Sequence, residues 1–289
     1  MKSSTFLRFP VAGPELALIA ITFVWGASFW VAQQAVAVSG PLAFVAARFG
    51  IAAALGVIFS GKQLRGLTRQ ELGTGLLIGA AIFGGYSLMT FGLTSISSSK
   101  SAFITAFYVP MVPILQWLLL KQPTHWRVWV AVLSALFGLL LLNGLGAAIA
   151  GFGVGEAATS LGACVIALEI ILISRVTPHL STIRVTIVQL ATASVLAVLA
   201  MPLAGEALPA MSGLFLASAI GVGCASAIIQ YAMNWAQRRI SATKATLIYA
   251  GEPVWAGLVG HTAGEHLPGS ALAGALLIIS AGVLSEWRR

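Results

Sequence analysis

The chain contains no aspartate, and its acidic side chains are eight glutamates among 289 residues. Charged residues account for 8% of the sequence, compared with about 25% in an ordinary soluble domain, whereas hydrophobic residues account for 58%. A water-soluble surface needs far more charge than this. The composition therefore excludes a typical soluble domain and predicts that most of the chain lies within a lipid bilayer.

Motifs for nucleotide hydrolysis, metal binding and nucleophilic catalysis are also missing. Residues 56–62 have the spacing of a phosphate-binding loop, but Gln63 stands where Ser or Thr is required, and no strand precedes the loop. Without aspartate there is no aspartate-based magnesium site, and the His and Glu residues of 261–266 lack the spacing of a helical zinc motif. No Gly-x-Ser-x-Gly motif occurs. We therefore expect no metal, no cofactor and no enzymatic activity.

Ten hydrophobic segments, each near the roughly 20 residues that cross a bilayer as a helix, occupy most of the chain. They are residues 14–37, 41–60, 71–95, 101–120, 126–146, 156–175, 183–204, 211–237, 244–263 and 268–286. Cys164 and Cys224 fall inside these segments, so they do not predict a disulfide framework. The sequence predicts an all-α integral membrane protein of ten transmembrane helices.

The distribution of basic residues gives the expected orientation. If the N-terminus lies in the cytoplasm, every Lys and Arg except Lys100 and Arg48 falls on the cytoplasmic side of this threading. Such a bias is the positive-inside rule, and it accounts for the net charge of +8 without a nucleic-acid partner. We expect a multi-pass protein of the cell inner (cytoplasmic) membrane with both termini in the cytoplasm.

The two halves of the chain repeat each other. Residues 96–102 align with residues 240–246, Pro110 aligns with Pro253, and Gln122 stands where the second half has Glu265. Because each half contains five segments, an odd number, the second half enters the membrane from the opposite side. We predict two inverted five-helix repeats, residues 1–150 and 151–289, with a shared site near the bilayer midplane.

Several of these motifs carry a family resemblance over essentially the whole chain. They are residues 25–30 (Trp-Gly-Ala-Ser-Phe-Trp), Pro41 followed by Arg48, the Ile-Ser-x-x-Lys-Ala block at 240–245, residues 252–254 (Glu-Pro-Val) and Glu265. The pattern resembles the drug/metabolite transporter superfamily and its ten-helix EamA-type branch, including YddG-like aromatic amino acid exporters. This resemblance implies ten helices, cytoplasmic termini and export of amino acids or related metabolites.

Three ionisable residues lie inside hydrophobic segments, where a charge costs about 2.5–3.5 kcal/mol on insertion scales. Arg48 is a candidate for holding a substrate carboxylate, or for fixing the fold by snorkelling or capping helix carbonyls. Glu252 is a candidate for binding a substrate ammonium or a proton, or for bracing the kink at Pro253. Glu169 is a candidate for proton or substrate binding.

Prolines interrupt the fourth and ninth segments at corresponding places. Pro110 and Pro113 lie in the fourth segment, and Pro253 lies in the ninth. Interrupted helices in matching positions point to the binding site of a transporter. These prolines are predicted hinges for two gates, although static kinks that improve packing are the alternative.

Aromatic and polar side chains fall inside the segments, where a flat organic substrate would find both apolar and hydrogen-bonding contacts. Packing of the core is the alternative for any one of them. The predicted binding residues are Trp25, Phe29, Tyr86, Met89, Tyr108, Glu169, Gln230, Tyr231, Asn234, Tyr249, Glu252 and Trp255.

These observations predict a secondary-active transporter that exports amino acids, aromatic ones among them, or related small metabolites by alternating access. Its expected partners are a small-molecule substrate and the lipid bilayer. An intramembrane enzyme and a passive channel for small polar solutes are the alternatives. The sequence leaves the oligomeric state open, and a monomer is compatible with it.

Overall fold

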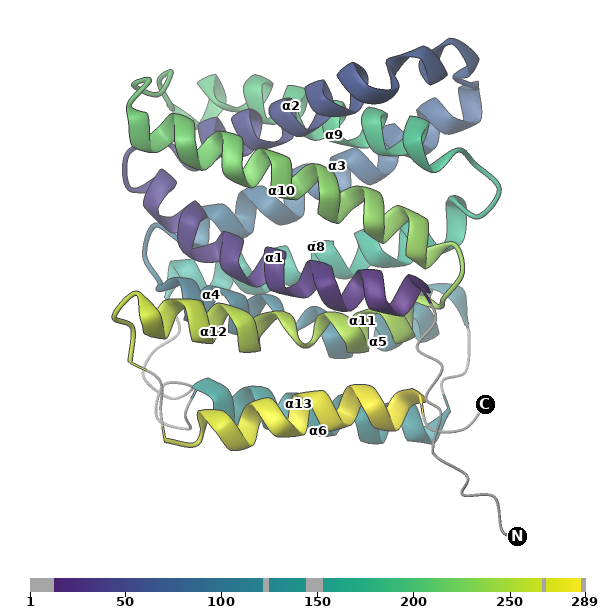
Figure 1. The fold of residues 1–289 in the computed structure, drawn as a ribbon, viewed down its shortest axis with the longest axis vertical. Helices are drawn as coiled ribbons and strands as arrows, with labels where there is room; N and C mark the ends of the chain where they lie inside the picture. The colour runs from purple at the N-terminus through teal and green to yellow at the C-terminus, as the bar shows by residue number, and fades with distance from the viewer. Residues whose placement is uncertain (1–12, 122–124, 144–152, 267–268, 287–289) are drawn as a thin grey trace, which may run out of the picture.

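The computed structural model describes residues 13–121, 125–143, 153–266 and 269–286, and within them every regular element is a helix (Figure 1). In chain order these are α1 (Gly13–Val36), α2 (Pro41–Ser60), η1 (Gly61–Gly66), α3 (Arg69–Gly92), α4 (Ser98–Thr105), α5 (Tyr108–Leu120), α6 (Trp126–Asn143), α8 (Val154–Val176), α9 (Thr182–Ala200), η2 (Pro202–Ala204), α10 (Gly213–Gln237), α11 (Ala242–Tyr249), α12 (Glu252–Thr262) and α13 (Ala271–Glu286). Gln122 and the terminal basic residues Lys2, Arg8, Arg288 and Arg289 lie outside the described residues.

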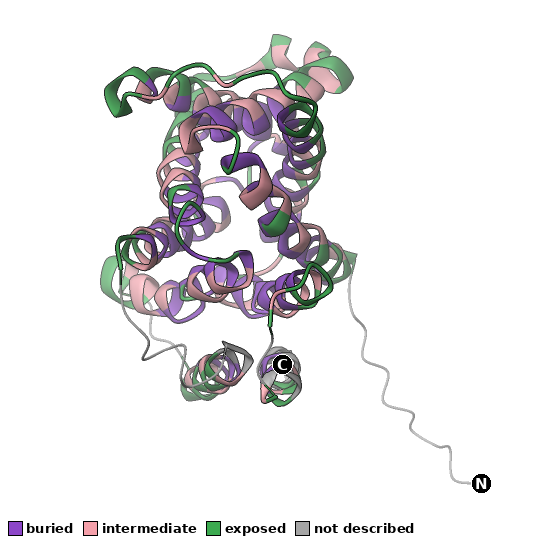
Figure 2. Cartoon of the chain, turned by 90° about the vertical axis from the view of Figure 1, so that its left-hand side faces the viewer, coloured by how far each residue is buried: buried purple, intermediate pink, exposed green. Residues whose placement is uncertain are grey.

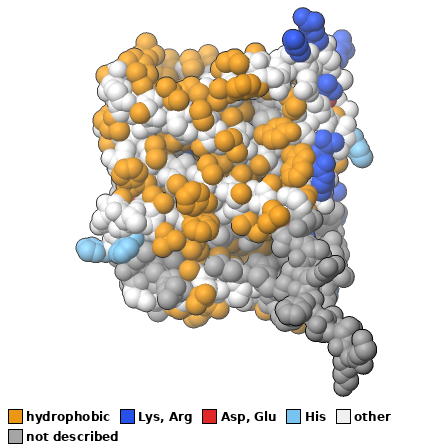
Figure 3. Space-filling view, viewed as in Figure 1, with side chains coloured by type: hydrophobic (Ala, Val, Ile, Leu, Met, Phe, Trp, Pro, Cys, Tyr) orange, Lys and Arg blue, Asp and Glu red, His pale blue; other side chains and the backbone are white. Residues whose placement is uncertain are grey.

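Within the described residues, seven helical stretches are long and apolar enough to cross a membrane. They are Gly13–Val36, Pro41–Gly66, Arg69–Gly92, Ser98–Leu120, Val154–Val176, Thr182–Ala204 and Gly213–Gln237, and a shorter apolar helix covers Trp126–Gly138. Large apolar side chains cover the face seen in Figure 3. Among the large apolar side chains of the described residues, Phe59 is 81% exposed and Leu133 is 63% exposed. Such a surface suits lipid rather than water, so the chain is a multi-pass membrane protein.

Lysine and arginine side chains gather at one end of the helix bundle (Figure 3). This end, here called the basic end, is where α1, α3, α9 and α11 begin and where α8 and α10 finish (Figure 1). Lys100 lies at the opposite end, at the start of α4. Lys100 is therefore separated from the basic end by the length of the helices.

Serine residues in the connections start several helices. The side chains of Ser97, Ser181, Ser212 and Ser241 accept hydrogen bonds from the backbone N–H groups three residues later, at the starts of α4, α9, α10 and α11. Each such cap satisfies one of the amide groups that the first helical turn leaves without an intrahelical partner.

The helices pack closely around a common core. α3 packs against α8 and α9, α2 against α9 and α10, and α1 against α10 and α12. A Cβ atom at Gly85 of α3 would lie 2.8 Å from Ile166 on α8, so glycine permits this close approach. α6 and α13 pair with each other beside the main group (Figures 1 and 2). Figure 2 shows the buried residues on the inward faces of the helices.

Two helices are interrupted at corresponding places. α4 ends at Thr105 and α5 begins at Tyr108, whereas α11 ends at Tyr249 and α12 begins at Glu252. Proline lacks the N–H that would bond the carbonyl four residues earlier. For Pro110 and Pro253 these carbonyls are those of Ala106 and Tyr249, directly at the two breaks. α5 continues through Pro113, so the interruption lies before Pro110 alone.

Candidate functional site

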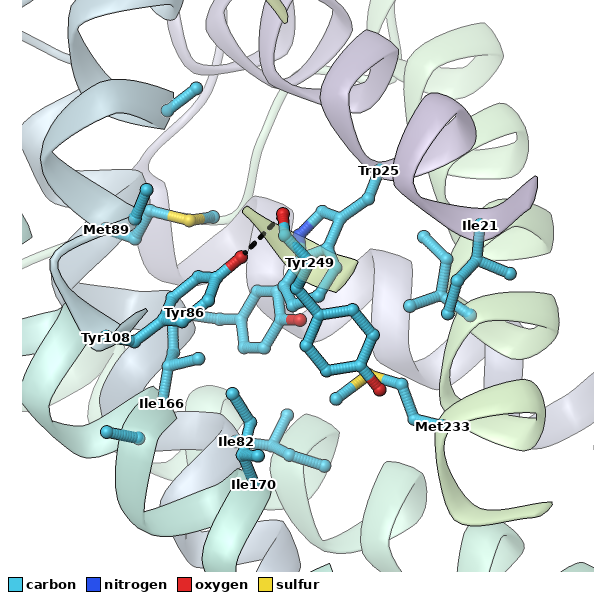
Figure 4. Close-up of a cluster of buried hydrophobic side chains, with 14 of the residues drawn as sticks. Ile21, Trp25, Ile82, Tyr86, Met89, Tyr108, Ile166, Ile170, Met233 and Tyr249 are labelled. Carbon is cyan, nitrogen blue, oxygen red and sulfur yellow. Dashed lines mark hydrogen bonds between the residues drawn. The ribbon is translucent and has the colours of Figure 1, made fainter. Parts of the chain in front are cut away.

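Four aromatic side chains from four helices meet in the core (Figure 4). The Trp25 ring of α1 stacks with those of Tyr86 of α3 and Tyr108 of α5, with centroids 6.3 Å apart in both pairs. Tyr249 of α11 meets the edge of Trp25 at 5.7 Å. Each of the four is at most 1% exposed. These residues, here called the aromatic cluster, bring the first, third, fourth and ninth sequence segments together.

A carboxylate lies beside this cluster at the joint of the two interrupted helices. The hydroxyl oxygen of Tyr108 lies 2.9 Å from Oε2 of Glu252 and 3.1 Å from the backbone carbonyl oxygen of Tyr249 (Figure 4 draws the latter contact). Glu252 is fully buried, and its Oε1 has no hydrogen-bond partner among the described residues. A Cβ atom at Gly26 would lie 2.6 Å from the Glu252 carbonyl oxygen, so glycine lets α1 pass close to this joint.

A second buried carboxylate ends a chain of side-chain amides. The Nε2 of Gln189 on α9 donates to Oε1 of Gln230 on α10, at 2.8 Å. The Nε2 of Gln230 donates in turn to Oε1 of Glu169 on α8, at 2.9 Å. Glu169 is fully buried and its Oε2 has no partner among the described residues. The amide of Gln230 thus holds one oxygen of Glu169, and the other oxygen is available to a further donor.

Arg48 of α2 supplies a buried positive charge. Its Nε and Nη2 donate to Oγ of Ser226, at 3.1 and 2.9 Å. The guanidinium carbon lies 4.9 Å from the ring centroid of Phe49 and 5.1 Å from that of Tyr86. Within the described part of the chain no carboxylate lies within ion-pair distance of Arg48. Its partners are a neutral hydroxyl and aromatic faces, which attract a cation without neutralising it.

Three other glutamates form ion pairs at the helix ends. Glu71 accepts two hydrogen bonds from the guanidinium of Arg184, both at 2.7 Å. Lys244 of α11 pairs with Glu15 of α1 at 2.6 Å. At the opposite end of the bundle, Lys100 of α4 pairs with Glu156 of α8 at 2.5 Å.

Two more glutamates bind helix starts. Glu206 accepts from the backbone N–H groups of Leu42 and Ala43 at the start of α2. Glu265 accepts from the hydroxyl of Ser98 and the backbone N–H of Ser99 at the start of α4. Among the carboxylates whose side chains are described, Glu169 and Glu252 therefore stand apart, because neither pairs with a cation or accepts from the N-terminus of another helix, although Glu252 is itself the first residue of α12. Unpaired ionisable groups in lipid are costly and mark functional sites.

The remaining residues predicted from the sequence have different surroundings. Phe29 and Met89 are buried in the core, and Asn234 is buried with its Oδ1 unpartnered. Trp255 is half-buried and donates through Nε1 to Thr22 at 3.2 Å. Tyr231 is 43% exposed on the outer face of α10, so the structure does not bring it to the aromatic cluster.

Some polar residues at the site were not among those predicted to bind substrate. Gln189 belongs to the amide chain that reaches Glu169. Ser226 holds Arg48, and Gln237 donates to the hydroxyl of Tyr249 at 2.8 Å. All three lie inside or at the end of apolar helices, so a search for uncharged polar residues within hydrophobic segments would have found them.

Comparison with known proteins identifies the family. The family model described as "EamA-like transporter family" matches residues 13–144 and matches again at residues 154–285. The chain belongs to the EamA-like transporter family. The two matches together cover most of the chain.

One curated relative and one solved structure are also similar to the chain. An "Uncharacterized transporter" of Archaeoglobus fulgidus is 32% identical over 160 residues, which cover 55% of this chain and 48% of that protein, so the match spans about half the length of this relative. A solved crystal structure superimposes with a TM-score of 0.75 at 19% identity, covering 95% of this chain and 96% of the other. The second similarity concerns the fold alone.

Proposed function

We propose that this EamA-family protein is a secondary-active exporter of amino acids, aromatic ones among them, or of closely related small metabolites. The observation that carries the proposal is a buried site with three unpaired ionisable groups around an aromatic cluster. An α-amino acid is a zwitterion, and it needs both an anionic and a cationic partner inside a membrane. Glu252 and Glu169 supply the first and Arg48 supplies the second.

In this proposal each group has a defined role. The free oxygens of Glu252 and Glu169 accept from the substrate ammonium. The guanidinium of Arg48 donates to the substrate carboxylate, and Tyr86 lies between Arg48 and Trp25. Trp25 presents a flat ring to an apolar or aromatic substrate side chain. Charge-assisted hydrogen bonds replace the water that the substrate loses on leaving the aqueous phase.

The architecture is proposed to be ten transmembrane helices in two inverted repeats, residues 1–150 and 151–289, with both termini in the cytoplasm of an inner membrane. The two matches to one family model support a duplication. The ion pairs support the inversion. Lys100 and Lys244 occupy aligned positions, each pairs with a glutamate in the first turn of a helix from the other half, and the pairs lie at opposite ends of the bundle.

Alternating access then requires that the two ends open in turn around the central site. The hinges are proposed to be the breaks before Pro110 and at Pro253, because backbone groups freed from helical bonds there let each half-helix turn separately. The lysine–glutamate pairs close the ends: Lys244–Glu15 at the basic, cytoplasmic end and Lys100–Glu156 at the outer end. Export is the direction implied by the sequence resemblance.

The experiment has two stages. A thermal-shift screen of the purified protein against the common amino acids identifies ligands, because a compound that binds the folded state raises the unfolding temperature. Liposomes containing the protein are then loaded with each positive compound, and uptake of the same radiolabelled compound is followed. Saturable counterflow with an unaltered product is expected of a carrier, whereas a channel gives no counterflow and an enzyme gives a new product.

A pair of tryptophan variants makes the test specific to the site. Trp25→Ala should reduce counterflow at least tenfold, because Trp25 contacts three of the other site rings. Trp117→Ala, at a tryptophan 58% exposed on the outer face of α5, should leave counterflow unchanged. Absence of flux for every amino acid tested, or equal loss in both variants, would contradict the proposal.

A further inference from the structure

The joint between the interrupted helices contains one hydroxyl and two oxygen partners. Tyr108 is the first residue of α5, Tyr249 is the last residue of α11, and Glu252 is the first residue of α12. The Tyr108 hydroxyl lies within hydrogen-bond distance of both the Tyr249 carbonyl and Glu252 Oε2. It therefore ties one interrupted helix to both pieces of the other.

The Tyr249 carbonyl depends on this hydroxyl. In a continuous helix the N–H of residue 253 would donate to it, but that residue is Pro253, which has no N–H. The donor that the structure records for this carbonyl is the Tyr108 hydroxyl, at 3.1 Å. In the first half the equivalent carbonyl, that of Ala106, is satisfied by the backbone N–H of Val109 at 2.9 Å. The Tyr108 hydroxyl thus satisfies the carbonyl freed by proline in the second half, whereas a backbone N–H satisfies it in the first half.

A tyrosine hydroxyl carries a single proton, and a carbonyl can only accept. If Tyr108 donates fully to the Tyr249 carbonyl, a proton on the carboxyl group turns its contact of 2.9 Å with Glu252 Oε2 into a second hydrogen bond. An ionised Glu252 would instead direct its lone pairs at those of the Tyr108 oxygen. It would do so in a dry interior, where an unpaired charge is costly.

Apart from the N-terminal end of α12, which Glu252 itself begins, the described residues around Glu252 provide no cation to compensate a charge on it. The titratable groups around it are the hydroxyls of Tyr86, Tyr108 and Tyr249 from α3, α5 and α11. α1, α4 and α6 also pack on α12, but their charged residues are engaged elsewhere. Those are Glu15 with Lys244, Lys100 with Glu156, and Arg127 over the ring of Trp126.

We propose that Glu252 is a proton-binding site whose proton is exchanged for the ammonium group of the substrate. This inference rests on the proposed function, since it assigns the coupling ion of the same site. The protonated acid donates to Tyr108 and joins α5 to α12. A substrate ammonium at the free Oε1 replaces the proton, which leaves to solvent, so that R–NH₃⁺ plus Glu252–COOH gives the ion pair plus H⁺. One positive charge enters as one leaves, and the protein is a proton–substrate antiporter.

Carbodiimide labelling tests the proton site without any substrate. Dicyclohexylcarbodiimide modifies protonated carboxyl groups in apolar surroundings, and mass spectrometry of peptides locates the adduct. We expect an adduct on Glu252 at neutral pH that decreases as the pH is raised. The ion-paired Glu71 and Glu156 serve as internal controls and should stay unmodified. An unmodified Glu252 in the folded protein would overturn the proposal.

Proton release tests the exchange. L-Tryptophan, L-phenylalanine and tryptamine are added to weakly buffered protein with a pH indicator, and each bound ligand should release a proton. Glu206→Gln, a matched change at a carboxylate outside the site, should keep the release, whereas Glu252→Gln should abolish it while the protein stays folded in a melting experiment. Binding without release in the wild-type protein would refute the exchange. Absence of binding and flux for all compounds would instead refute the proposed function. The carbodiimide labelling of Glu252 would then still test the proton site, because it needs no substrate.

Discussion

Under the proposed function, removing one lysine–glutamate pair is expected to open one end of the molecule and not the other. The perturbation is Lys244→Met, which keeps the apolar stem of the side chain but deletes the charge facing Glu15 at 2.6 Å. The mirrored change is Lys100→Met, which deletes the partner of Glu156 at 2.5 Å. Each substitution is the matched control of the other, because the pairs lie at opposite ends of the bundle.

The magnitude follows from the exposure of the two pairs. The lysine side chains are 27% and 26% exposed and their glutamates 10% and 12%, so both pairs are neither fully solvated nor dry. Exposed pairs contribute about 0.2–1 kcal/mol and breaking a buried pair costs about 3–5 kcal/mol. We expect about 1 kcal/mol here, which changes the ratio of open to closed states at that end by about fivefold.

The assay uses one cysteine reporter at each end. Ser101 of α4 and Ala245 of α11 occupy aligned positions in the two halves, and both are fully buried behind the ion pairs. With Cys164 and Cys224 replaced by serine, Ser101→Cys and Ala245→Cys each report maleimide modification at one end. Lys244→Met should speed the reaction of the Ala245→Cys reporter about fivefold and slow that of the Ser101→Cys reporter.

Lys100→Met should produce the opposite pair of changes. Equal acceleration at both reporters would show that the ion pairs stabilise the whole bundle rather than close its ends, and that result would refute the reasoning. A double-mutant cycle with Glu15→Gln isolates the coupling between the two side chains, because Lys244 has further interactions.

Two further predictions concern the packing of a glycine and the ion pair between Glu71 and Arg184. Gly26→Ala should lower the unfolding free energy by about 1–3 kcal/mol, because the added Cβ would lie 2.6 Å from the Glu252 carbonyl oxygen, a backbone atom. Gly221→Ala, with nothing within 4 Å of its added Cβ, should leave stability unchanged or raise it by up to about 1 kcal/mol, so equal melting temperatures for the two variants would contradict this account. Glu71→Gln should cost about 2 kcal/mol in denaturant unfolding by weakening both hydrogen bonds from Arg184, and an unchanged midpoint would show that this pair adds nothing.

The membrane class and the helix positions could be predicted from the sequence because they depend on local composition. Hydropathy over about 20 residues locates a helix that lipid accepts, whatever its neighbours are. The interruptions were predictable for the same reason, since Pro110 and Pro253 each remove a backbone donor from a known carbonyl. Pro113 shows the limit of this rule, because α5 continues through it.

The face of a helix that points inward was harder to predict than the position of the helix in the sequence. Tyr231 and Gln230 are adjacent on α10, and both were expected at the site. Gln230 is 1% exposed and bonds Glu169, whereas Tyr231 is 43% exposed. In a membrane helix the apolar residues surround the whole circumference, so the hydrophobic pattern does not fix the rotation. That rotation is set by packing against helices distant in the sequence.

The contact partners of the charged residues could not be predicted from the sequence, because they too depend on packing between distant helices. Nothing in the chain near Arg48 indicates Ser226, which lies 178 positions away, and nothing near Glu15 indicates Lys244. The internal repeat could have connected Lys100 with Lys244, because their positions align. It could not have shown that each contacts the first turn of a helix in the other half.

The differences between the two halves concentrate at the centre of the molecule. The ion pairs at the two ends are equivalent, which agrees with the proposal that each closes one end. At the centre, Arg48 aligns with Gln189, Glu169 has no acidic counterpart in the first half, and the carbonyl freed by proline is satisfied by the backbone in one half and by Tyr108 in the other. A symmetric scaffold gives two end states of similar energy, whereas an asymmetric centre gives one binding site with a fixed arrangement of charges. Substitutions at the ends should therefore change which side the site faces, and substitutions at the centre should change what it binds.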